Sequence, residues 1–188
     1  MKMNDYINDF TSHLKDAINI GNNSSLDPKF NPIDNVLICG LGGSGIGGTI
    51  ANDIIGKNAT IPIVASKDYS IPNFVSKNTL VIVNSYSGNT EETLSALEKC
   101  QSRGAEIAVI TSGGKLKLIA EKNNHNKIII PGNHPPRAMF GYAFTQLFFV
   151  LHHYGIINHS FKNDFEKAIL LLNSEKENIQ EKAFLLAK

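Results

Sequence analysis

The sequence predicts an α/β protein in which a five-stranded parallel sheet carries helices on both faces. Five short runs rich in valine and isoleucine follow one another between residues 36 and 130, and helical segments separate most of them. The runs are apolar at consecutive positions, as expected for strands buried on both faces, and parallel sheets contain such strands. The alternation of strand and helix also predicts right-handed crossovers between parallel neighbours.

The individual elements follow from this alternation. The expected strands cover residues 36–39, 61–65, 80–83, 107–110 and 128–130, and the intervening helices cover 46–55, 90–103 and 115–122. Gly104 is expected to end the second of these helices, because glycine adopts the left-handed conformation that follows many helices. Two long helices, at 137–154 and 164–187, complete the chain.

An amphipathic helix is expected before the first strand. Tyr6, Phe10, Leu14 and Ile18 recur every four residues and therefore share one face of a helix. Gly21 and the polar residues after it are expected to end this helix.

Composition and charge exclude several classes of function. The formal net charge is +1 and the basic residues form no cluster, so neither nucleic acid nor a membrane is an expected partner. Cys39 and Cys100 lack the spacing of metal ligands or of a CxxC pair, and we expect both in the core.

The apolar stretch 138–151 is too short to span a bilayer. The N-terminal segment is not a signal peptide, because acidic residues interrupt it, and we therefore expect a cytoplasmic protein.

A cluster of hydroxyl groups follows the third expected strand. Ser85, Ser87 and Thr90 stand within six residues, immediately before a helix. Hydroxyls and the free N–H groups of a helix N-terminus together form a donor-rich nest for a phosphate monoester. The alternative is a helix cap by Asn89 with Glu92 as its reciprocal partner, but one cap needs one side chain rather than three hydroxyls.

The first expected strand leads into the glycine-rich segment 40–48, which includes Gly43 and Ser44. Backbone N–H groups of such a segment can approach an anion closely. Residues 40–45 also match GxGxxG, the fingerprint of a dinucleotide site. However, the second strand ends in Ser66-Lys67-Asp68 rather than in a convincing acidic partner. A tight turn without a ligand is the other alternative.

Two further loops belong to the same edge of the predicted sheet. Residues 111–114 either line the site or form an ordinary turn. Residues 131–137 contain three prolines and end at Arg137, whose charge at a helix N-terminus opposes the helix dipole. We interpret this placement as functional, with the guanidinium holding an anion or a developing enediolate. His134 in the same loop is either a proton carrier or an ordinary loop residue, and the other histidines form no metal-ligand pattern.

These segments together resemble the sugar isomerase (SIS) domain. The matching motifs are Gly42-Gly43-Ser44-Gly45, Ser85-Tyr86-Ser87-Gly88-Asn89-Thr90-Glu91-Glu92-Thr93, Ile110-Thr111-Ser112-Gly113-Gly114 and Pro135-Pro136-Arg137. They extend in order over nearly the whole chain and look most like the first half of the bifunctional phosphoglucose/phosphomannose isomerases.

The resemblance implies a flavodoxin-like fold and reversible conversion of glucose 6-phosphate or mannose 6-phosphate to fructose 6-phosphate, without a cofactor. It divides the chain into an N-terminal helical arm (1–30), an SIS domain (31–160) and a C-terminal helix (161–188) that leads toward a second SIS domain. The implied site residues are the phosphate-binding Ser85, Ser87 and Thr90, the sugar-phosphate contacts Gly43 and Ser44, and Arg137, which would stabilise the enediolate.

The resemblance also implies that one catalytic group lies elsewhere. Moving a proton between C1 and C2 needs a positioned carboxylate base, and in this family that glutamate lies beyond the first SIS domain. Glu166, Glu175, Glu177 and Glu181 do not match its motif, so we expect a fragment or a half-length protein that binds substrate and lacks the base. A non-catalytic regulatory SIS domain and a single-SIS phosphoheptose-type isomerase stay open as alternatives.

The expected assembly is a homodimer. Phe140, Phe144, Phe148 and Phe149 give the helix at 137–154 an aromatic face, which either mediates dimerisation or belongs to the core.

Overall fold

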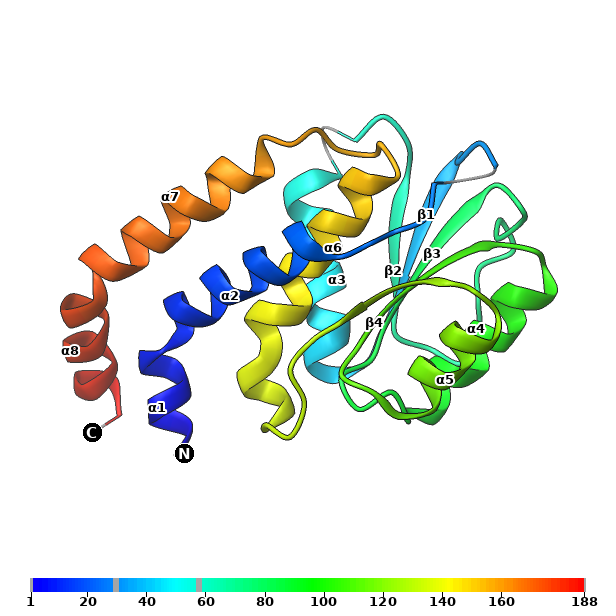
Figure 1. Cartoon of the computed structure of the whole chain (residues 1–188). Helices are drawn as coiled ribbons and strands as arrows, with labels where there is room; N and C mark the ends of the chain where they lie inside the picture. The colour runs from blue at the N-terminus through cyan, green and yellow to red at the C-terminus, as the bar shows by residue number, and fades with distance from the viewer. Residues whose placement is uncertain (1, 29–30, 57–58, 188) are drawn as a thin grey trace.

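A five-stranded sheet forms the centre of the computed structural model, which describes residues 2–28, 31–56 and 59–187 (Figure 1). The strand order is β2-β1-β3-β4-β5, and all neighbours are parallel. The strands are β1 (Asn35–Cys39), β2 (Ile63–Ser66), β3 (Thr79–Asn84), β4 (Glu106–Thr111) and β5 (Asn126–Ile129). This is the flavodoxin-like order, so the predicted fold class is confirmed.

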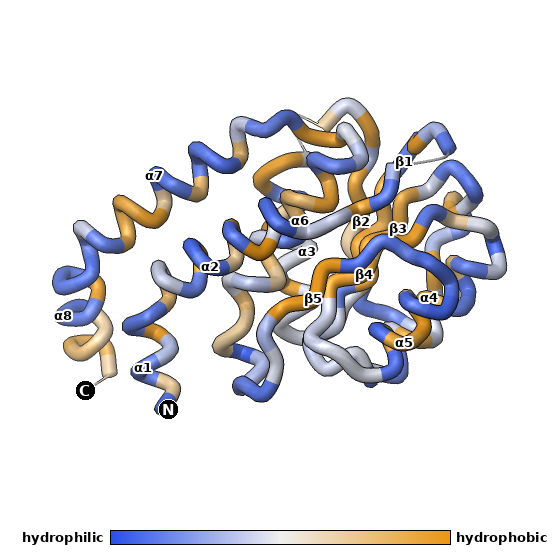
Figure 2. The backbone as a smooth tube through the Cα atoms, in the orientation of Figure 1, coloured by the Kyte–Doolittle hydropathy of each residue, from blue (hydrophilic) through white to orange (hydrophobic). Residues whose placement is uncertain are grey.

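Helices cover both faces of the sheet because alternate strand residues point to opposite sides. Ile38 and Ile82 belong to one core, beneath α3 (Gly42–Ile55) and α6 (Phe140–His153). Val81 and Val109 belong to the other core, beneath α4 (Glu91–Ser102) and α5 (Gly114–Lys122). Figure 2 shows hydrophobic positions concentrated in the strands and in α6. None of the helices in the described part of the chain is both long and apolar enough to cross a membrane.

Two helices that the sequence pattern predicts as continuous are each divided in two. The N-terminal helix breaks at Asp9 into α1 (Met3–Asn8) and α2 (Phe10–Asn23), and the C-terminal helix breaks at Glu175 into α7 (Phe161–Ser174) and α8 (Lys176–Leu186). Both breaks occupy a single residue, with φ −93° and ψ near 0°, so the apolar spacing continues across them. The predicted boundaries at residues 1, 30 and 188 lie outside the described residues.

The helix expected at 137–154 starts instead as a 3₁₀ turn, η1 (Pro136–Met139), before α6 begins. Pro135 and Pro136 have no N–H group to donate. The turn therefore closes with the Ala138 N–H donating to the Pro135 carbonyl at 2.9 Å.

The glycine-rich segment is mostly helix rather than loop, because α3 begins at Gly42 and not near Ile46. Close packing explains Gly45, where a Cβ atom would collide with the Gly40 carbonyl oxygen, and Gly48. A Cβ atom at Gly48 would lie 2.8 Å from the Ile38 side chain of β1, so glycine lets α3 lie directly on the sheet.

The aromatic face of α6 is packed inside the chain. Phe148 and Phe149 are buried, and their ring centroids lie 5.1 Å from Phe165 and Phe161 of α7, respectively. Phe144 also contacts Phe165, at 6.0 Å. This face is therefore covered by α7 and is not free to form the interface that we expected, and the oligomeric state stays a prediction.

The two cysteines are core residues, as predicted. Cys39 and Cys100 are buried in the same core between the sheet and α4. The neighbouring Cys100 thiol and burial both raise the pKa of Cys39, which therefore stays protonated at neutral pH.

His125 gives the stability of the fold a dependence on pH. The half-buried ring contacts the side-chain nitrogen of Gln101 at 2.8 Å, and burial lowers its pKa below the ordinary value of 6.5, against the opposing attraction of Glu106. Below pH 6.5 the unfolded chain therefore binds more protons than the folded one, and stability falls as the pH falls through the folded pKa.

We predict that His125→Gln loses less stability on acidification than the wild type does. Urea unfolding at about pH 7.5 and about pH 5.5 brackets the ordinary histidine pKa and measures this difference. His159→Gln, at an exposed position, serves as the control and should keep most of the wild-type pH dependence. Equal pH dependence in the His125 variant and the wild type would contradict this assignment.

Candidate functional site

A cavity of about 470 Å³ lies beyond the carboxyl ends of β1 and β3. Here the strand order reverses, since the chain passes from β1 outward to β2 and from β3 in the other direction to β4. Such a reversal leaves a crevice between the two departing loops, where ligands of open parallel sheets bind. The cavity is lined by Leu41, Gly42, Gly43, Ser44, Tyr86, Ser87, Thr90, Pro136 and Arg137.

The three predicted hydroxyls have different positions. Ser87 and Thr90 line the cavity, whereas Ser85 does not and is only 3% exposed. The Ser85 and Thr90 hydroxyl oxygens lie 3.0 Å apart, within hydrogen-bonding distance. Ser85 therefore orients Thr90 from beneath the loop instead of facing the cavity itself.

The helix-capping alternative for this loop is wrong. Thr90, not Asn89, is the N-cap residue of α4, and no side chain caps this helix within the described structure. The Asn89 side-chain oxygen instead accepts a hydrogen bond from the Lys115 N–H at 3.0 Å. The start of α4 thus offers backbone N–H groups and the positive end of a helix dipole beside the Thr90 hydroxyl, as an anion site requires.

A second helix start meets the same cavity. Gly43 and Ser44 lie in the first turn of α3, whose N-cap residue Leu41 makes no side-chain capping bond. Asn84, at the end of β3, donates from its side chain to the Ser44 carbonyl at 3.2 Å. Asn84 thereby joins the two loops that border the cavity. Our sequence interpretation missed it, although a polar residue that ends a buried apolar strand is a recognisable signal.

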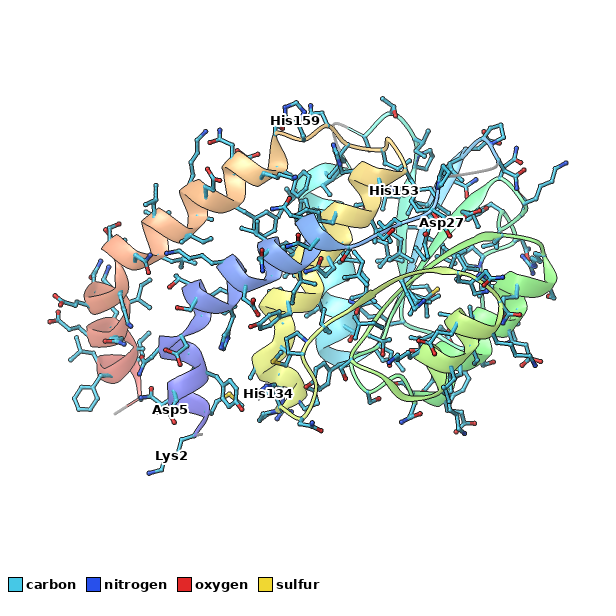
Figure 3. All side chains as sticks on the ribbon, viewed as in Figure 1. Lys2, Asp5, Asp27, His134, His153 and His159 are labelled. Carbon is cyan, nitrogen blue, oxygen red and sulfur yellow. The ribbon has the colours of Figure 1, made fainter. Side chains whose placement is uncertain are left out.

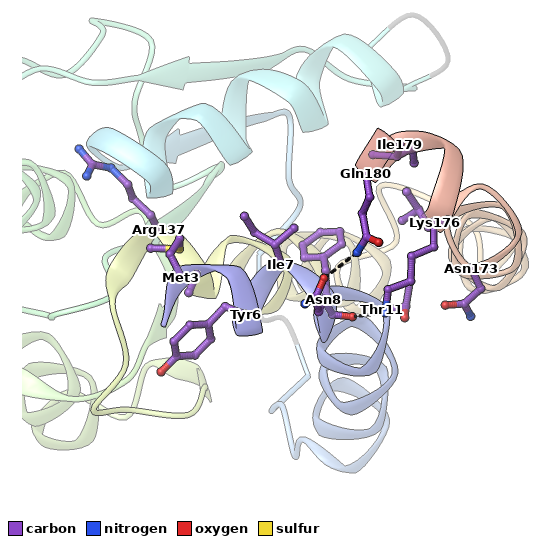
Figure 4. Close-up of a pocket in the computed structure, with 13 residues that line it drawn as sticks. Met3, Tyr6, Ile7, Asn8, Thr11, Arg137, Asn173, Lys176, Ile179 and Gln180 are labelled. Carbon is purple, nitrogen blue, oxygen red and sulfur yellow. Dashed lines mark hydrogen bonds between the residues drawn. The ribbon is translucent and has the colours of Figure 1, made fainter. Parts of the chain in front are cut away.

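Arg137, within η1, also lines the cavity. Its side chain is exposed and has no carboxylate partner among the described residues. In Figure 4 the guanidinium points away from the side chains of α1 and α8, toward α3. The cavity drawn in that figure, about 300 Å³ and mainly apolar, is lined by residues of α1, α2, α7 and α8 and by Arg137 and Ala138 of η1, so Arg137 borders both cavities.

The two remaining candidates from the sequence lie outside the cavity lining. His134 makes a hydrogen bond between its ring Nδ1 and the Tyr6 hydroxyl at 2.9 Å, and Figure 3 shows it next to α1. The 111–114 turn supports the site from behind, since the Ser112 hydroxyl donates to the Tyr86 carbonyl at 2.7 Å.

The cavity lining within the described structure contains no aspartate or glutamate. The glutamates considered from the sequence, Glu166, Glu175, Glu177 and Glu181, lie on or between α7 and α8. The same described residues hold no cluster of histidine, cysteine or acidic side chains that could bind a metal ion. The arrangement can therefore hold an anion with hydroxyls, helix N-termini and one guanidinium.

Comparison with known proteins agrees with this geometry. The model of the SIS domain matches residues 29–155. The chain belongs to the SIS-domain family. Because the matched segment contains β1 to β5 and every residue that lines the cavity, the family resemblance includes the whole candidate site.

Two curated relatives are similar in sequence to this SIS chain over most of its length. The bifunctional phosphoglucose/phosphomannose isomerase of Caldicellulosiruptor bescii is 42% identical over 164 residues, which is 87% of this chain and 48% of the relative. The D-glucosamine-6-phosphate 4-epimerase of Sulfolobus acidocaldarius is 38% identical over 66% of this chain and 39% of the relative. The chain thus spans about half the length or less of these curated relatives.

A solved structure has the same fold. A Clostridium difficile protein described as a phosphosugar isomerase superposes with a TM-score of 0.75 over 96% of this chain and 54% of its own, at 18% sequence identity.

Two glycines in the loops around the cavity, Gly88 and Gly43, allow the loop conformation to be tested by a pair of matched substitutions. Gly88 has φ +66°, and a Cβ atom there would collide with the Gly113 carbonyl oxygen, whereas a Cβ at Gly43 would meet nothing within 4 Å. We predict that Gly88→Ala destabilises the protein by about 2 kcal/mol or more. Gly43→Ala should leave stability unchanged or raise it by up to about 1 kcal/mol, because alanine favours helix.

Urea unfolding of both variants measures this difference. A Gly88→Ala protein as stable as the wild type would show that the 85–90 loop does not need its left-handed turn.

Proposed function

We propose that this chain is the sugar-phosphate-binding half of a phosphoglucose/phosphomannose isomerase. The observation that carries the proposal is the 42% identity to such an isomerase across 87% of the chain, which includes the whole cavity lining. The epimerase relative acts, by its name, on a hexosamine 6-phosphate instead of a hexose 6-phosphate, and it matches 66% of this chain. This supports a shared sugar-phosphate site to which different chemistry is added elsewhere.

In this proposal the phosphate group binds where donors converge. The Ser87 and Thr90 hydroxyls and the N-terminal N–H groups of α4 donate to the phosphate oxygens, and Ser85 holds Thr90 in place. Gly43 and Ser44, at the start of α3, contact the sugar phosphate from the neighbouring loop. A cavity of about 470 Å³ falls within the usual size range for small-molecule sites.

Arg137 then lies at the sugar end of the ligand. Isomerisation between C1 and C2 passes through an enediolate, whose negative charge the guanidinium would stabilise as it develops. Because only protons move, one from C2 to C1 and one from O2 to O1, the reaction needs no redox cofactor. The base is supplied from outside this chain, since no carboxylate lines the described cavity.

Calorimetric titration with fructose 6-phosphate, followed by a coupled isomerase assay on the same sample, tests the proposal. We expect binding without turnover. Turnover by the chain itself would favour a complete single-domain isomerase with a base from within the chain or from a partner subunit. Failure to bind any hexose 6-phosphate would overturn the proposed function.

We further predict that Ser87→Ala combined with Thr90→Ala abolishes measurable binding of fructose 6-phosphate while the fold stays intact. Two hydrogen bonds to a charged phosphate, each worth about 1.5–3 kcal/mol, correspond to a loss of at least about 100-fold in affinity. Ser102→Ala combined with Ser174→Ala removes two hydroxyls remote from the cavity and should bind as the wild type does. Unchanged affinity in the Ser87/Thr90 variant would place the phosphate elsewhere.

A further inference from the structure

Tyr86 joins three loops at the edge of the candidate site. Its backbone carbonyl accepts hydrogen bonds from the Ser112 N–H at 3.0 Å and the Ser112 hydroxyl at 2.7 Å. Its phenolic oxygen accepts a hydrogen bond from the His134 N–H at 3.0 Å. The residue between Ser85 and Ser87 thus connects the phosphate loop both to the β4–α5 turn and to the proline-rich loop 131–137.

A second tyrosine holds the proline-rich loop from the opposite side. The Tyr6 hydroxyl of α1 lies 2.9 Å from the Nδ1 atom of His134, and the two rings meet edge to face with centroids 5.7 Å apart. Tyr6 is only 7% exposed, so its ring is fixed in the packing between α1 and the rest of the protein. His134 is therefore held through its backbone by Tyr86 and through its side chain by Tyr6.

The proline-rich loop has few other attachments. Apart from the backbone bonds that form η1 and α6, the hydrogen bonds that join residues 131–137 to the rest of the described structure are the two made by His134. Pro131, Pro135 and Pro136 contribute no N–H groups, which limits the backbone bonds that this segment can form. Arg137 follows His134 by three residues, and its guanidinium has no ion-pair partner among the described residues to fix it independently.

We propose that Tyr86 and Tyr6 are positioning residues, which act through His134 to hold Arg137 at the sugar end of the cavity. This inference rests on the proposed function, in which Arg137 contacts the part of the ligand that carries the developing charge. In this inference the role of His134 is to fix the proline-rich loop. It also makes α1 a working part of the site, although α1 lines no part of the cavity itself.

Binding of two ligands distinguishes a displaced Arg137 from a damaged phosphate-binding cradle, by which we mean Ser87, Thr90 and the N-terminus of α4. Inorganic phosphate occupies only the cradle, whereas 5-phosphoarabinonate adds a carboxylate whose charge resembles that of the enediolate and therefore reports on Arg137. We expect Tyr86→Phe and Tyr6→Phe each to weaken binding of 5-phosphoarabinonate about tenfold, the equivalent of one hydrogen bond. Binding of inorganic phosphate should stay within about twofold.

Tyr142→Phe is the matched control. Its hydroxyl donates to Asp16 at 2.9 Å and not to the proline-rich loop, so both affinities should stay at their wild-type values. A loss in this control as large as in Tyr86→Phe would overturn the proposal, because a general effect of removing a phenolic hydroxyl would then explain the results.

A double-mutant cycle with Arg137→Gln tests whether Tyr86 acts through Arg137. If it does, Tyr86→Phe causes no further loss of 5-phosphoarabinonate affinity once the guanidinium is gone. An equal loss in both backgrounds, or an equal loss for inorganic phosphate and 5-phosphoarabinonate, would overturn the positioning role.

Amide hydrogen exchange tests the loop without any ligand. In Tyr86→Phe the amides of His134 and Ala138 should exchange faster than in the wild type, because one hydrogen bond is lost and the η1 turn loosens. If the wild type binds neither probe, the proposed function fails, while this measurement still decides whether Tyr86 holds the loop. Unchanged exchange at both amides would overturn the inference.

Discussion

The reversal of strand order between β1 and β3 is the constraint on which the candidate site depends. From β1 the chain crosses one face of the sheet through α3, and from β3 it crosses the other face through α4. The starts of these two helices therefore diverge from adjacent strand ends, and the space between them cannot be filled by either helix. Ser44 and Ser87 face the same cavity for this reason, and Asn84 ties the two loops together where they separate.

The cavity lining, as far as the structure describes it, combines neutral donors with a single cation, Arg137. In the proposal, hydroxyls and helix N–H groups bind the phosphate, whereas Arg137 serves the sugar end of the ligand. This arrangement suits a reaction in which the phosphate keeps its charge throughout and new charge develops on the sugar, because a guanidinium is most useful where charge appears in the transition state. Binding and proton transfer would then reside in different parts of a longer assembly, which fits a chain that spans about half of its isomerase relatives.

Rigidity in the proline-rich loop has to come from side chains. Its three prolines restrict the backbone dihedral angles but remove N–H donors, so the loop cannot be fixed by a ladder of backbone hydrogen bonds. The hydroxyls of Tyr86 and Tyr6 replace that ladder at His134. Since Tyr86 stands between Ser85 and Ser87, its hydrogen bond to His134 links the 85–90 loop directly to the proline-rich loop.

Much of the fold was predictable because its signals are local. Valine and isoleucine at consecutive positions indicated buried parallel strands, and Ser87 and Thr90 before a helix indicated an anion site, since each pattern lies within a few residues. The close approach of α3 to the sheet and the covering of Phe148 by α7 depended on packing between distant segments, and the breaks at Asp9 and Glu175 left no signal in the apolar spacing. The sequence by itself determined the sheet, its crossovers and the donor-rich loop. Only the tertiary structure decided that Ser85 is buried with its hydroxyl 3.0 Å from that of Thr90, because burial depends on what packs around the loop. It alone also decided that Tyr6 contacts His134, because a contact between residues 128 positions apart leaves no periodic trace in the chain.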